Sequence, residues 1–375
     1  MTARPRICWI LDDTDRSGES SRLHALLGEP ALAERFERHV ISLAPPGAMA
    51  LELQSAGAAL HAATEVERGS GMLDTGVTVM RVMTLLKGLR PDVVHACGSA
   101  AAFVGTAAAR LAAVPAVVVS PHSEERRGEF ERMALTWALR GADQVLADTE
   151  AHAASLAARH GIVRSKLRVV SPLATAHRCA HQQELPALAG ARKLVSLVRF
   201  HANENLLWIV ECVAILRRFH PGICWTVFGT GVAGAALLRA AGARGLDSAL
   251  KLPGETDDPL GVLLAADIFV QPRRTVFPPQ ALLEAMHAGR AVVSVDAPGA
   301  RAVMTDGREG LLVHAEPASL VADAVDRLLM SAPLREDCAR HAQERMRALP
   351  TAAERAREFA ELYGALAGRA LSFAV

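Results

Sequence analysis

The chain has 375 residues, of which 51% are hydrophobic and 22% charged, so it can bury a large core and is too long for one open-sheet domain. Its 41 basic and 40 acidic residues leave a formal net charge of +1, which excludes a global field that recruits nucleic acid or an anionic surface. We therefore expect two domains, no nucleic-acid partner, and only local anion sites.

The cysteines are scattered and form no CxxC pair, so neither a zinc site nor a disulfide framework is indicated. They are Cys8, Cys97, Cys179, Cys212, Cys224 and Cys338. We expect reduced thiols in a cytoplasmic protein that needs no metal.

The chain opens with a predicted strand, Ile7 to Leu11. This apolar run is too short for a signal peptide and is followed at once by Asp12 and Asp13. The most apolar region, residues 100–120, is interrupted by Arg110 and Pro115, which favours a buried helix and strand over a membrane span.

A polar loop, residues 12–21, follows the first strand. Gly18 allows a tight turn there, and Ser20 or Ser21 is expected to cap a helix that begins near Arg22. The loop has no GxGxxG pattern, so the sequence does not support a dinucleotide site.

Short apolar runs then alternate with helical segments, which predicts parallel sheets. In the first half we predict strands at residues 39–43, 58–62, 93–95, 116–120, 144–147 and 167–170. In the second half we predict strands at residues 193–197, 224–228, 250–252, 268–271, 291–295 and 310–313.

Two histidines, His95 and His122, end predicted strands, and each has two interpretations. Either one can donate to sugar hydroxyls or phosphate oxygens at the crevice beyond the strand ends, or it can be a satisfied structural side chain. The structural interpretation is favoured more for His95, because Pro121 and Ser123 place His122 in a turn.

The segment 171–192 carries Pro, Ala, Gln and Gly without a sustained apolar period, which is typical of a linker. We therefore predict an N-terminal Rossmann-like domain at residues 1–172. A C-terminal Rossmann-like domain follows at 173–351, its linker at about 173–192, and residues 352–375 form a terminal helix. The predicted fold is α/β, with two lobes and a cleft between them.

The second lobe contains a predicted helix whose apolar face includes Leu282, Leu283 and Met286 and leaves Glu284 at its edge. A buried strand, residues 291–295, follows after Gly289. A helix start at the end of an open sheet favours anions such as phosphate. The alternative is that Glu284 is only a solvated helix residue.

Several motifs resemble, in order and spacing, those of the retaining nucleotide-sugar glycosyltransferases of family four, and the resemblance covers nearly the whole chain. In the first lobe they are PDVVHACGS, RGADQVLADTEA and KLRVVSP. In the second they are LVRFHANENLL, WTVFGTG, AADIFVQP and LLEAMHAGRAVVSVDAPGARAVMTDGREGLLV. The resemblance implies the GT-B architecture of two facing lobes, with the acceptor on the first and the nucleotide-sugar on the second.

The resemblance also implies roles for individual residues. Arg199 matches the basic residue that neutralises the diphosphate, Gly229 and Gly231 the turn that approaches the nucleotide, and Glu284 the carboxylate that holds the ribose hydroxyls. Gly18 matches the first-lobe loop near the diphosphate. His122 matches the histidine near the donor sugar. His122 and Arg199 are therefore the catalytic candidates.

Two positions depart from the family pattern. Val276 occupies the place of a second carboxylate eight positions before Glu284, and Glu204 occupies the place of a lysine that binds the diphosphate. Arg273 and Arg274, on the same approach loop, are candidates for the missing cation, although they also fit a solvated basic pair.

The resemblance implies a cytoplasmic, metal-independent hexosyltransferase that transfers sugar with retention from a UDP- or GDP-sugar to a glycan, lipid-linked or small-molecule acceptor. It needs no further cofactor. The alternative is a GT-B homologue that has lost transfer and serves as a binding or scaffold subunit. An epimerase ranks below both, because the motif order in the second lobe is that of the transferases.

Two helices complete the predictions. Residues 124–140 combine Arg126, Arg127 and Arg132 with Phe130 and Trp137, a face that fits either peripheral contact with the inner membrane or packing on its own domain. Residues 352–371 have apolar side chains at helical spacing, and the family resemblance implies that this helix crosses back to the first lobe.

Overall fold

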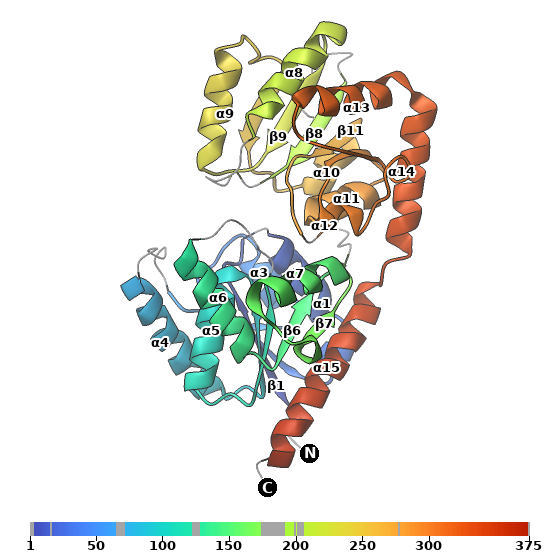
Figure 1. Ribbon diagram of the computed structural model, residues 1–375. Helices are drawn as coiled ribbons and strands as arrows, with labels where there is room; N and C mark the ends of the chain where they lie inside the picture. Colours follow the sequence, from blue (N-terminus) through green and yellow to red (C-terminus); the bar gives the residue numbers. More distant parts are fainter. Residues whose placement is uncertain are drawn as a thin grey trace. The chain divides into compact units, whose positions relative to one another are not determined.

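The computed structural model describes residues 4–15, 17–64, 72–121, 128–173, 192–198, 200, 206–276 and 278–373. The chain divides into two compact units, one formed by residues 1–175 and 350–375 and the other by residues 176–349. Each unit is a parallel sheet covered by helices on both faces (Figure 1). The predicted α/β fold class is confirmed.

The sheet of the first unit has the strand order β3-β2-β1-β4-β5-β6-β7, and all its pairs are parallel. Its strands are β1 (Arg6–Leu11), β2 (Glu37–Ser42), β3 (Ala59–Ala62), β4 (Val93–Cys97), β5 (Ala116–Ser120), β6 (Gln144–Ala147) and β7 (Leu167–Val169). Its helices are α1 (Gly18–Leu27), α2 (Pro30–Ala33), α3 (Ala50–Ser55), α4 (Met72–Leu89), α5 (Ser99–Leu111), α6 (Glu129–Gly141), α7 (Glu150–His160), the 3-10 turn η1 (Arg164–Lys166) and α15 (Ala352–Phe373).

Strand β1 is a continuous apolar run because side chains on both of its faces are buried. Cys8 and Ile10 belong to the core under α4 and α5, whereas Trp9 and Leu11 belong to the core under α1 and α15. A strand buried on both faces has no polar side to alternate with, and a continuous apolar run results.

Helix α15, from the far end of the chain, packs against α1 and α2 of the first unit. Tyr363 is fully buried, and Leu362, Phe359 and Leu366 pack around it in the same core. The indole Nε1 of Trp9 donates a hydrogen bond to the Tyr363 Oη at 3.1 Å, which ties the helix to the middle of β1.

The start of α1 differs from the prediction. Ser17, not Ser20 or Ser21, is the N-cap, because its extended backbone lets its side chain accept the N–H of Ser20. Gly18 is the first helical residue and makes no tight turn. The predicted helix start near Arg22 is therefore four residues late.

The sheet of the second unit has the order β10-β9-β8-β11-β12-β13 and is also parallel. Its strands are β8 (Lys193–Leu197), β9 (Cys224–Phe228), β10 (Leu250–Gly254), β11 (Ile268–Gln271), β12 (Ala291–Val295) and β13 (Leu311–Val313). Its helices are α8 (Trp208–Phe219), α9 (Val232–Gly242), α10 (Pro259–Ala265), α11 (Gln280–His287), α12 (Pro298–Arg301), α13 (Ala318–Met330) and α14 (Ala332–Arg347).

Every predicted strand is present, with ends within two residues of those predicted. Most of the predicted linker, residues 174–191, lies outside the described residues. No helix in the described part of the chain is both long and apolar enough to cross a membrane.

Candidate functional site

The second unit has a glycine turn between β9 and α9, at the carboxyl end of the sheet. Gly229 and Gly231 have φ angles of +141° and +135°, which side chains with a Cβ rarely adopt. A Cβ on Gly229 would lie 1.6 Å from the Val198 carbonyl oxygen, and one on Gly231 would lie 2.2 Å from that of Phe200. The turn therefore brings bare backbone to the edge where open α/β sheets bind ligands.

Helix α11 carries Glu284, which is only 9% exposed. The side-chain amide of Gln280, one turn earlier, donates to the Glu284 carboxylate at 3.2 Å. The interpretation of Glu284 as a solvated helix residue was wrong, because the neighbouring Leu283 and Ala285 are fully buried and draw this part of the helix inward. A buried carboxylate at this edge can accept hydrogen bonds from two adjacent hydroxyls.

The loop between β11 and α11 carries one of the two departures from the family pattern, Val276. Val276 is partly buried, and Pro278 and Pro279 follow it, so two positions before the helix have no backbone N–H to offer an anion. Pro279 is the N-cap of α11, without a side-chain cap. The site thus lacks both a carboxylate and two amide donors at this loop.

The two candidate cations on the same loop differ in exposure. Arg273 is half-buried and Arg274 is exposed. The pKa of Asp296, just after β12, lies below its usual range, chiefly because Arg301 donates hydrogen bonds to it, one of 2.6 Å, and in smaller part because of Arg274. Arg274 is therefore close enough to the ends of β11 and β12 to act on a charge there.

Three predicted site residues, His122, Arg199 and Glu204, lie outside the described residues. Gly18 is in the first turn of α1, in the first unit. Within the described residues, the structure places Gly229, Gly231 and Glu284 on the second unit.

His95 belongs to a buried network of hydrogen bonds between β4, β5 and α15. Its Nδ1 lies 2.6 Å from the Tyr363 Oη, and its Nε2 lies 2.7 Å from the Ser120 Oγ. The structural interpretation of His95 is thus confirmed by its contacts.

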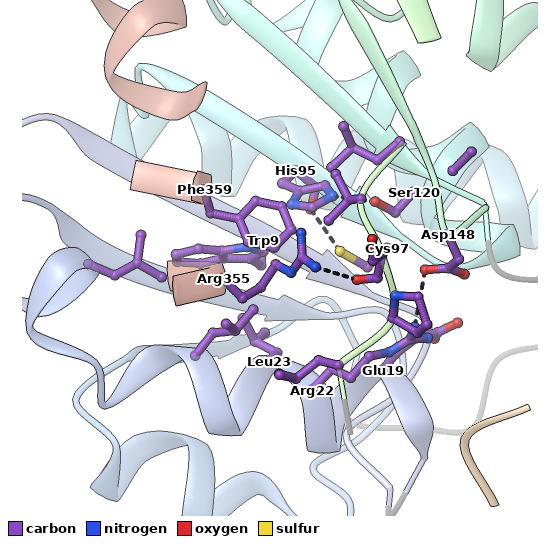
Figure 2. Close-up of a pocket in the computed structure, with 18 of the residues that line it drawn as sticks. Trp9, Glu19, Arg22, Leu23, His95, Cys97, Ser120, Asp148, Arg355 and Phe359 are labelled. Atoms are coloured by element: carbon purple, nitrogen blue, oxygen red, sulfur yellow. Dashed lines mark hydrogen bonds and ion pairs between the residues drawn. The ribbon is translucent and has the colours of Figure 1, made fainter. Parts of the chain in front are cut away.

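A cavity of about 70 Å³ lies beside this network, between the first sheet and α15 (Figure 2). Its polar lining includes Glu19, Arg22, Asp148 and Arg355, and Arg22 pairs with Asp148 at 3.4 Å. None of these residues was singled out from the sequence. One signal was present, since Arg355 falls on the same helical stripe as the apolar Phe359, where an arginine is unexpected.

Both halves of the chain match known families. Residues 191–331 match the model described as glycosyl transferases group 1, and residues 30–178 match the model described as glycosyltransferase family 4. The chain belongs to the group 1 glycosyltransferases. The family resemblance predicted from the motifs is confirmed at this level.

Two curated proteins are similar to the chain over part of their length. The chain is 27% identical over 183 residues to the lipopolysaccharide core biosynthesis glycosyltransferase LpsE of Rhizobium meliloti, a match that covers 48% of this chain and 53% of LpsE. It is 29% identical over 146 residues to the alpha-D-kanosaminyltransferase of Streptomyces kanamyceticus, covering 38% of each chain. The matches thus span about half of the first relative and less of the second.

Solved structures share the fold over almost the whole chain. HepE of Anabaena, crystallised with UDP and glucose, has a TM-score of 0.77 at 18% identity and is covered to 99%, against 96% of this chain. Sucrose-phosphate synthase of Thermosynechococcus elongatus has a TM-score of 0.79 at 18% identity, with 98% of this chain and 100% of that chain covered. The likeness shows the two-unit, Rossmann-like GT-B fold.

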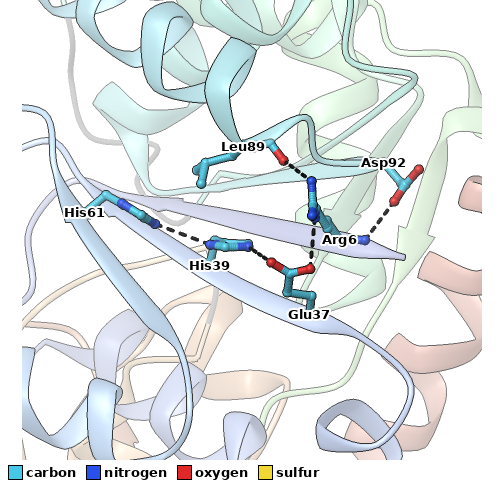
Figure 3. A network of polar contacts seen from close by, with 6 residues as sticks. All are labelled: Arg6, Glu37, His39, His61, Leu89 and Asp92. Carbon is cyan, nitrogen blue, oxygen red and sulfur yellow. Dashed lines mark hydrogen bonds and ion pairs between the residues drawn. The ribbon is translucent and has the colours of Figure 1, made fainter. Parts of the chain in front are cut away.

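A second polar cluster of this group 1 glycosyltransferase lies at the opposite edge of the first sheet (Figure 3). Arg6 donates to Glu37 at 2.9 Å, His39 lies 3.0 Å from Glu37, and His61 lies 3.3 Å from His39. The hydrogen bond from Arg6 is the main reason that the pKa of Glu37 is lowered. Burial, followed by the neighbouring His39, lowers the pKa of His61. Since these side chains contact one another across β1, β2 and β3, we interpret the cluster as structural.

Proposed function

We propose that the protein is a retaining glycosyltransferase that moves a hexose from a nucleotide-sugar to a glycan, lipid-linked or small-molecule acceptor. Two features of the second unit carry the proposal. One is the turn after β9, where only glycine fits at positions 229 and 231, and the other is the buried carboxylate of Glu284. The family match supports it, as do the similar HepE structures, which contain UDP or UDP-glucose.

In this proposal the second unit binds the nucleotide. The turn of Gly229 and Gly231 lets the backbone approach the nucleotide, and Glu284 accepts hydrogen bonds from the ribose hydroxyls. Arg199, with Arg273 or Arg274, offsets the charge that develops on the departing diphosphate, where a fixed cation lowers the barrier. His122 contacts the donor sugar.

We propose that the reaction uses no metal. It also needs no protein base, because the departing phosphate can take the acceptor's proton. The adjacent Asp12 and Asp13 near the N-terminus fit a structural role better than metal binding. The Asp12 carboxylate accepts the N–H groups of Ser99 and Ala101, at 3.0 and 2.6 Å, and so caps α5. A carboxylate committed in this way is a poor metal ligand.

Nucleotide binding and turnover test the proposal separately. We expect UDP or GDP, at 100 times its dissociation constant, to stabilise the protein by about 2.7 kcal/mol, a rise in melting temperature of roughly 5–10 °C. Nucleotide release from a panel of sugar donors then measures turnover, and the anomeric NMR coupling of the first product reports retention.

Glu284→Gln keeps the shape of the side chain and removes its charge, so it should weaken nucleotide binding about tenfold or more, because hydrogen bonds to charged groups contribute about 1.5–3 kcal/mol. Glu336→Gln, on an exposed residue of α14, is the matched control and should bind as the wild type does. Equal affinities in the two variants would sink the assignment of Glu284 to the nucleotide.

The loop before α11 favours a second candidate, a binding or scaffold subunit without transfer activity. Val276 removes a carboxylate, and Pro278 and Pro279 remove two N–H donors, while the glycine turn and Glu284 are retained. This candidate predicts a nucleotide-dependent rise in melting temperature without nucleotide release from any sugar donor in the panel.

Helix α6 favours a lipid-linked acceptor and peripheral contact with the cytoplasmic face of a membrane. Phe130, Met133 and Trp137 are 62%, 67% and 50% exposed, while Leu135 and Leu139 pack on their own unit. Exposed aromatic side chains beside the exposed Arg132 fit an anionic bilayer surface. Co-sedimentation with phosphatidylglycerol vesicles should fall in Phe130→Ser/Trp137→Ser and persist in Leu111→Ser, which changes an exposed leucine of α5.

A further inference from the structure

The loop that follows β12 runs beside the loop that carries Val276. Strands β11 and β12 are parallel neighbours, so their chains leave the carboxyl edge of the second sheet side by side, about 4.8 Å apart. Further along, the Gly299 N–H donates to the Thr275 carbonyl oxygen at 2.8 Å and joins the two loops. Asp296, the first residue after β12, therefore lies next to the approach loop of the candidate nucleotide site.

Asp296 carries a charged carboxylate whose direction is fixed. Its side chain is 13% exposed, and the Arg301 guanidinium donates to both of its oxygens, one of the bonds being 2.6 Å long. The hydrogen bond from Arg301 is the main reason that the pKa of Asp296 is low, and the nearby charges of His314 and Arg274 act in the same direction. The carboxylate is therefore ionised at neutral pH.

The pair with Arg301 does not use the whole carboxylate. An ionised carboxylate has about four lone-pair sites, and the two N–H groups of Arg301 occupy two of them. Within the part of the chain that the structure describes, Arg301 is the only hydrogen-bond donor to Asp296. Arg301 is itself 66% exposed, and an exposed pair of this kind adds little to stability. The pair instead orients a carboxylate that can still accept hydrogen bonds from hydroxyl groups.

The proposed transfer gives such a carboxylate a task. The bond between the anomeric carbon of the donor sugar and the diphosphate oxygen breaks, and its electron pair leaves with the diphosphate. The acceptor oxygen forms the new bond to that carbon, and its proton passes to an oxygen of the departing phosphate. Positive charge develops on the sugar ring meanwhile, and a fixed carboxylate beside the ring stabilises it.

The approach loop does not supply this carboxylate, because its position 276 is a valine. We propose that Asp296, on the neighbouring loop, contacts the donor sugar and takes the role that Val276 cannot fill, with Arg301 as the residue that positions it. This role rests on the proposed function, since it assigns a further residue of the same site.

Turnover and nucleotide binding, measured on one variant, separate this role from a structural one. Asp296→Asn keeps the shape of the side chain and removes its charge. The probe is whichever of UDP-glucose, UDP-galactose, UDP-N-acetylglucosamine and GDP-mannose the wild type uses fastest. We expect kcat for nucleotide release to fall about tenfold or more. The dissociation constant of the matching nucleoside diphosphate, which has no sugar, should stay within about twofold of the wild type, because Asp296 contacts the sugar alone.

A matched control changes another carboxylate of the same unit that has a partner. Asp326, on α13, lies 2.6 Å from the Nε2 of His220. Asp326→Asn should alter neither kcat nor the affinity for the nucleoside diphosphate.

A second substitution tests whether the two loops share one role. Val276→Glu returns a carboxylate to the approach loop, so it should raise kcat about fivefold or more when Asp296 is already asparagine. The same change should have an effect about threefold smaller, or less, in the wild type, where the role is filled. Asp296→Asn leaves the Arg301 guanidinium without its partner. If that variant does not fold, Asp296→Asn/Arg301→Gln, which removes both members of the exposed pair, replaces it in both comparisons.

The outcomes separate this role from the proposed function. Wild-type turnover that Asp296→Asn leaves unchanged would overturn the role of Asp296 and leave the proposed function intact. The role also fails if Asp296→Asn weakens binding of the nucleoside diphosphate as much as it slows turnover, or if Val276→Glu acts by the same factor in both backgrounds, because the two positions are then independent. Absence of turnover by the wild type with every donor would overturn the proposed function itself, and the role of Asp296 with it.

Discussion

Replacing Gly231 by alanine tests the close backbone approach on which the candidate nucleotide site rests. Gly231 has φ +135° and ψ 170°, a region adopted almost only by glycine, where another residue costs about 1–3 kcal/mol. The added Cβ would lie 2.2 Å from the Phe200 carbonyl oxygen, so backbone must also shift, at about 1–3 kcal/mol. We therefore expect Gly231→Ala to lower the free energy of unfolding by about 2–6 kcal/mol.

The assay is thermal unfolding with Gly245→Ala as the control. Gly245 also has a positive φ, +63°, but a Cβ there meets no atom within 4 Å, so only the backbone conformation is penalised, at about 1–2 kcal/mol. With a shift of about 2–4 °C per kcal/mol, Gly231→Ala should melt roughly 4–24 °C below the wild type and Gly245→Ala roughly 2–8 °C below it. Similar melting temperatures of the two variants, with UDP binding intact in both, would refute the close approach.

Three further predictions follow from the same structure. Val276→Glu restores a carboxylate beside the approach loop, and we expect faster nucleotide release from at least one sugar donor if the protein is an enzyme; unchanged release in a donor-by-donor comparison would contradict this. Arg274→Gln removes a charge near Asp296 and should raise the dissociation constant for UDP about twofold to fivefold, measured by calorimetry, while Arg308→Gln should not. The third concerns His61, whose pKa is lowered from its usual 6.5 in the folded protein. The unfolded chain therefore binds more protons, and the free energy of unfolding should fall as the pH drops below about 6.5. His61→Gln should flatten that part of a pH series of urea midpoints, and an unchanged slope would contradict the assignment.

Most of the strands were predictable because they are short apolar runs bounded by turn residues. The central ones, such as β4, β5 and β12, are buried on both faces, which makes the run continuous. The same holds for α11, whose leucines fix which face turns inward. Glu284 could be named as a candidate from its motif, but its burial could not, since that depends on what packs over the helix.

Contacts between residues that are far apart in the chain could not be predicted from the sequence. Asp12 caps α5 across 87 residues, a task that the acidic loop after the first strand does not reveal. The cavity beside α15 joins Arg22, Asp148 and Arg355, which meet only because the last helix docks on the first unit. The periodicity of apolar residues within one segment does not predict which distant segments it will contact.

A functional role of the candidate nucleotide site is better tested at Glu284 than at the glycine turn. The turn has a structural task in either case, since the Gly229 N–H donates to the Gly254 carbonyl oxygen at 2.7 Å and joins β9 to β10. A buried carboxylate, in contrast, opposes folding unless its desolvation is fully offset. We therefore expect Glu284→Gln to raise the melting temperature of the ligand-free protein by a few degrees while it weakens nucleotide binding, the opposition typical of a residue retained for function. A loss of stability together with unchanged nucleotide affinity would mean that Glu284 serves the fold and does not bind the nucleotide.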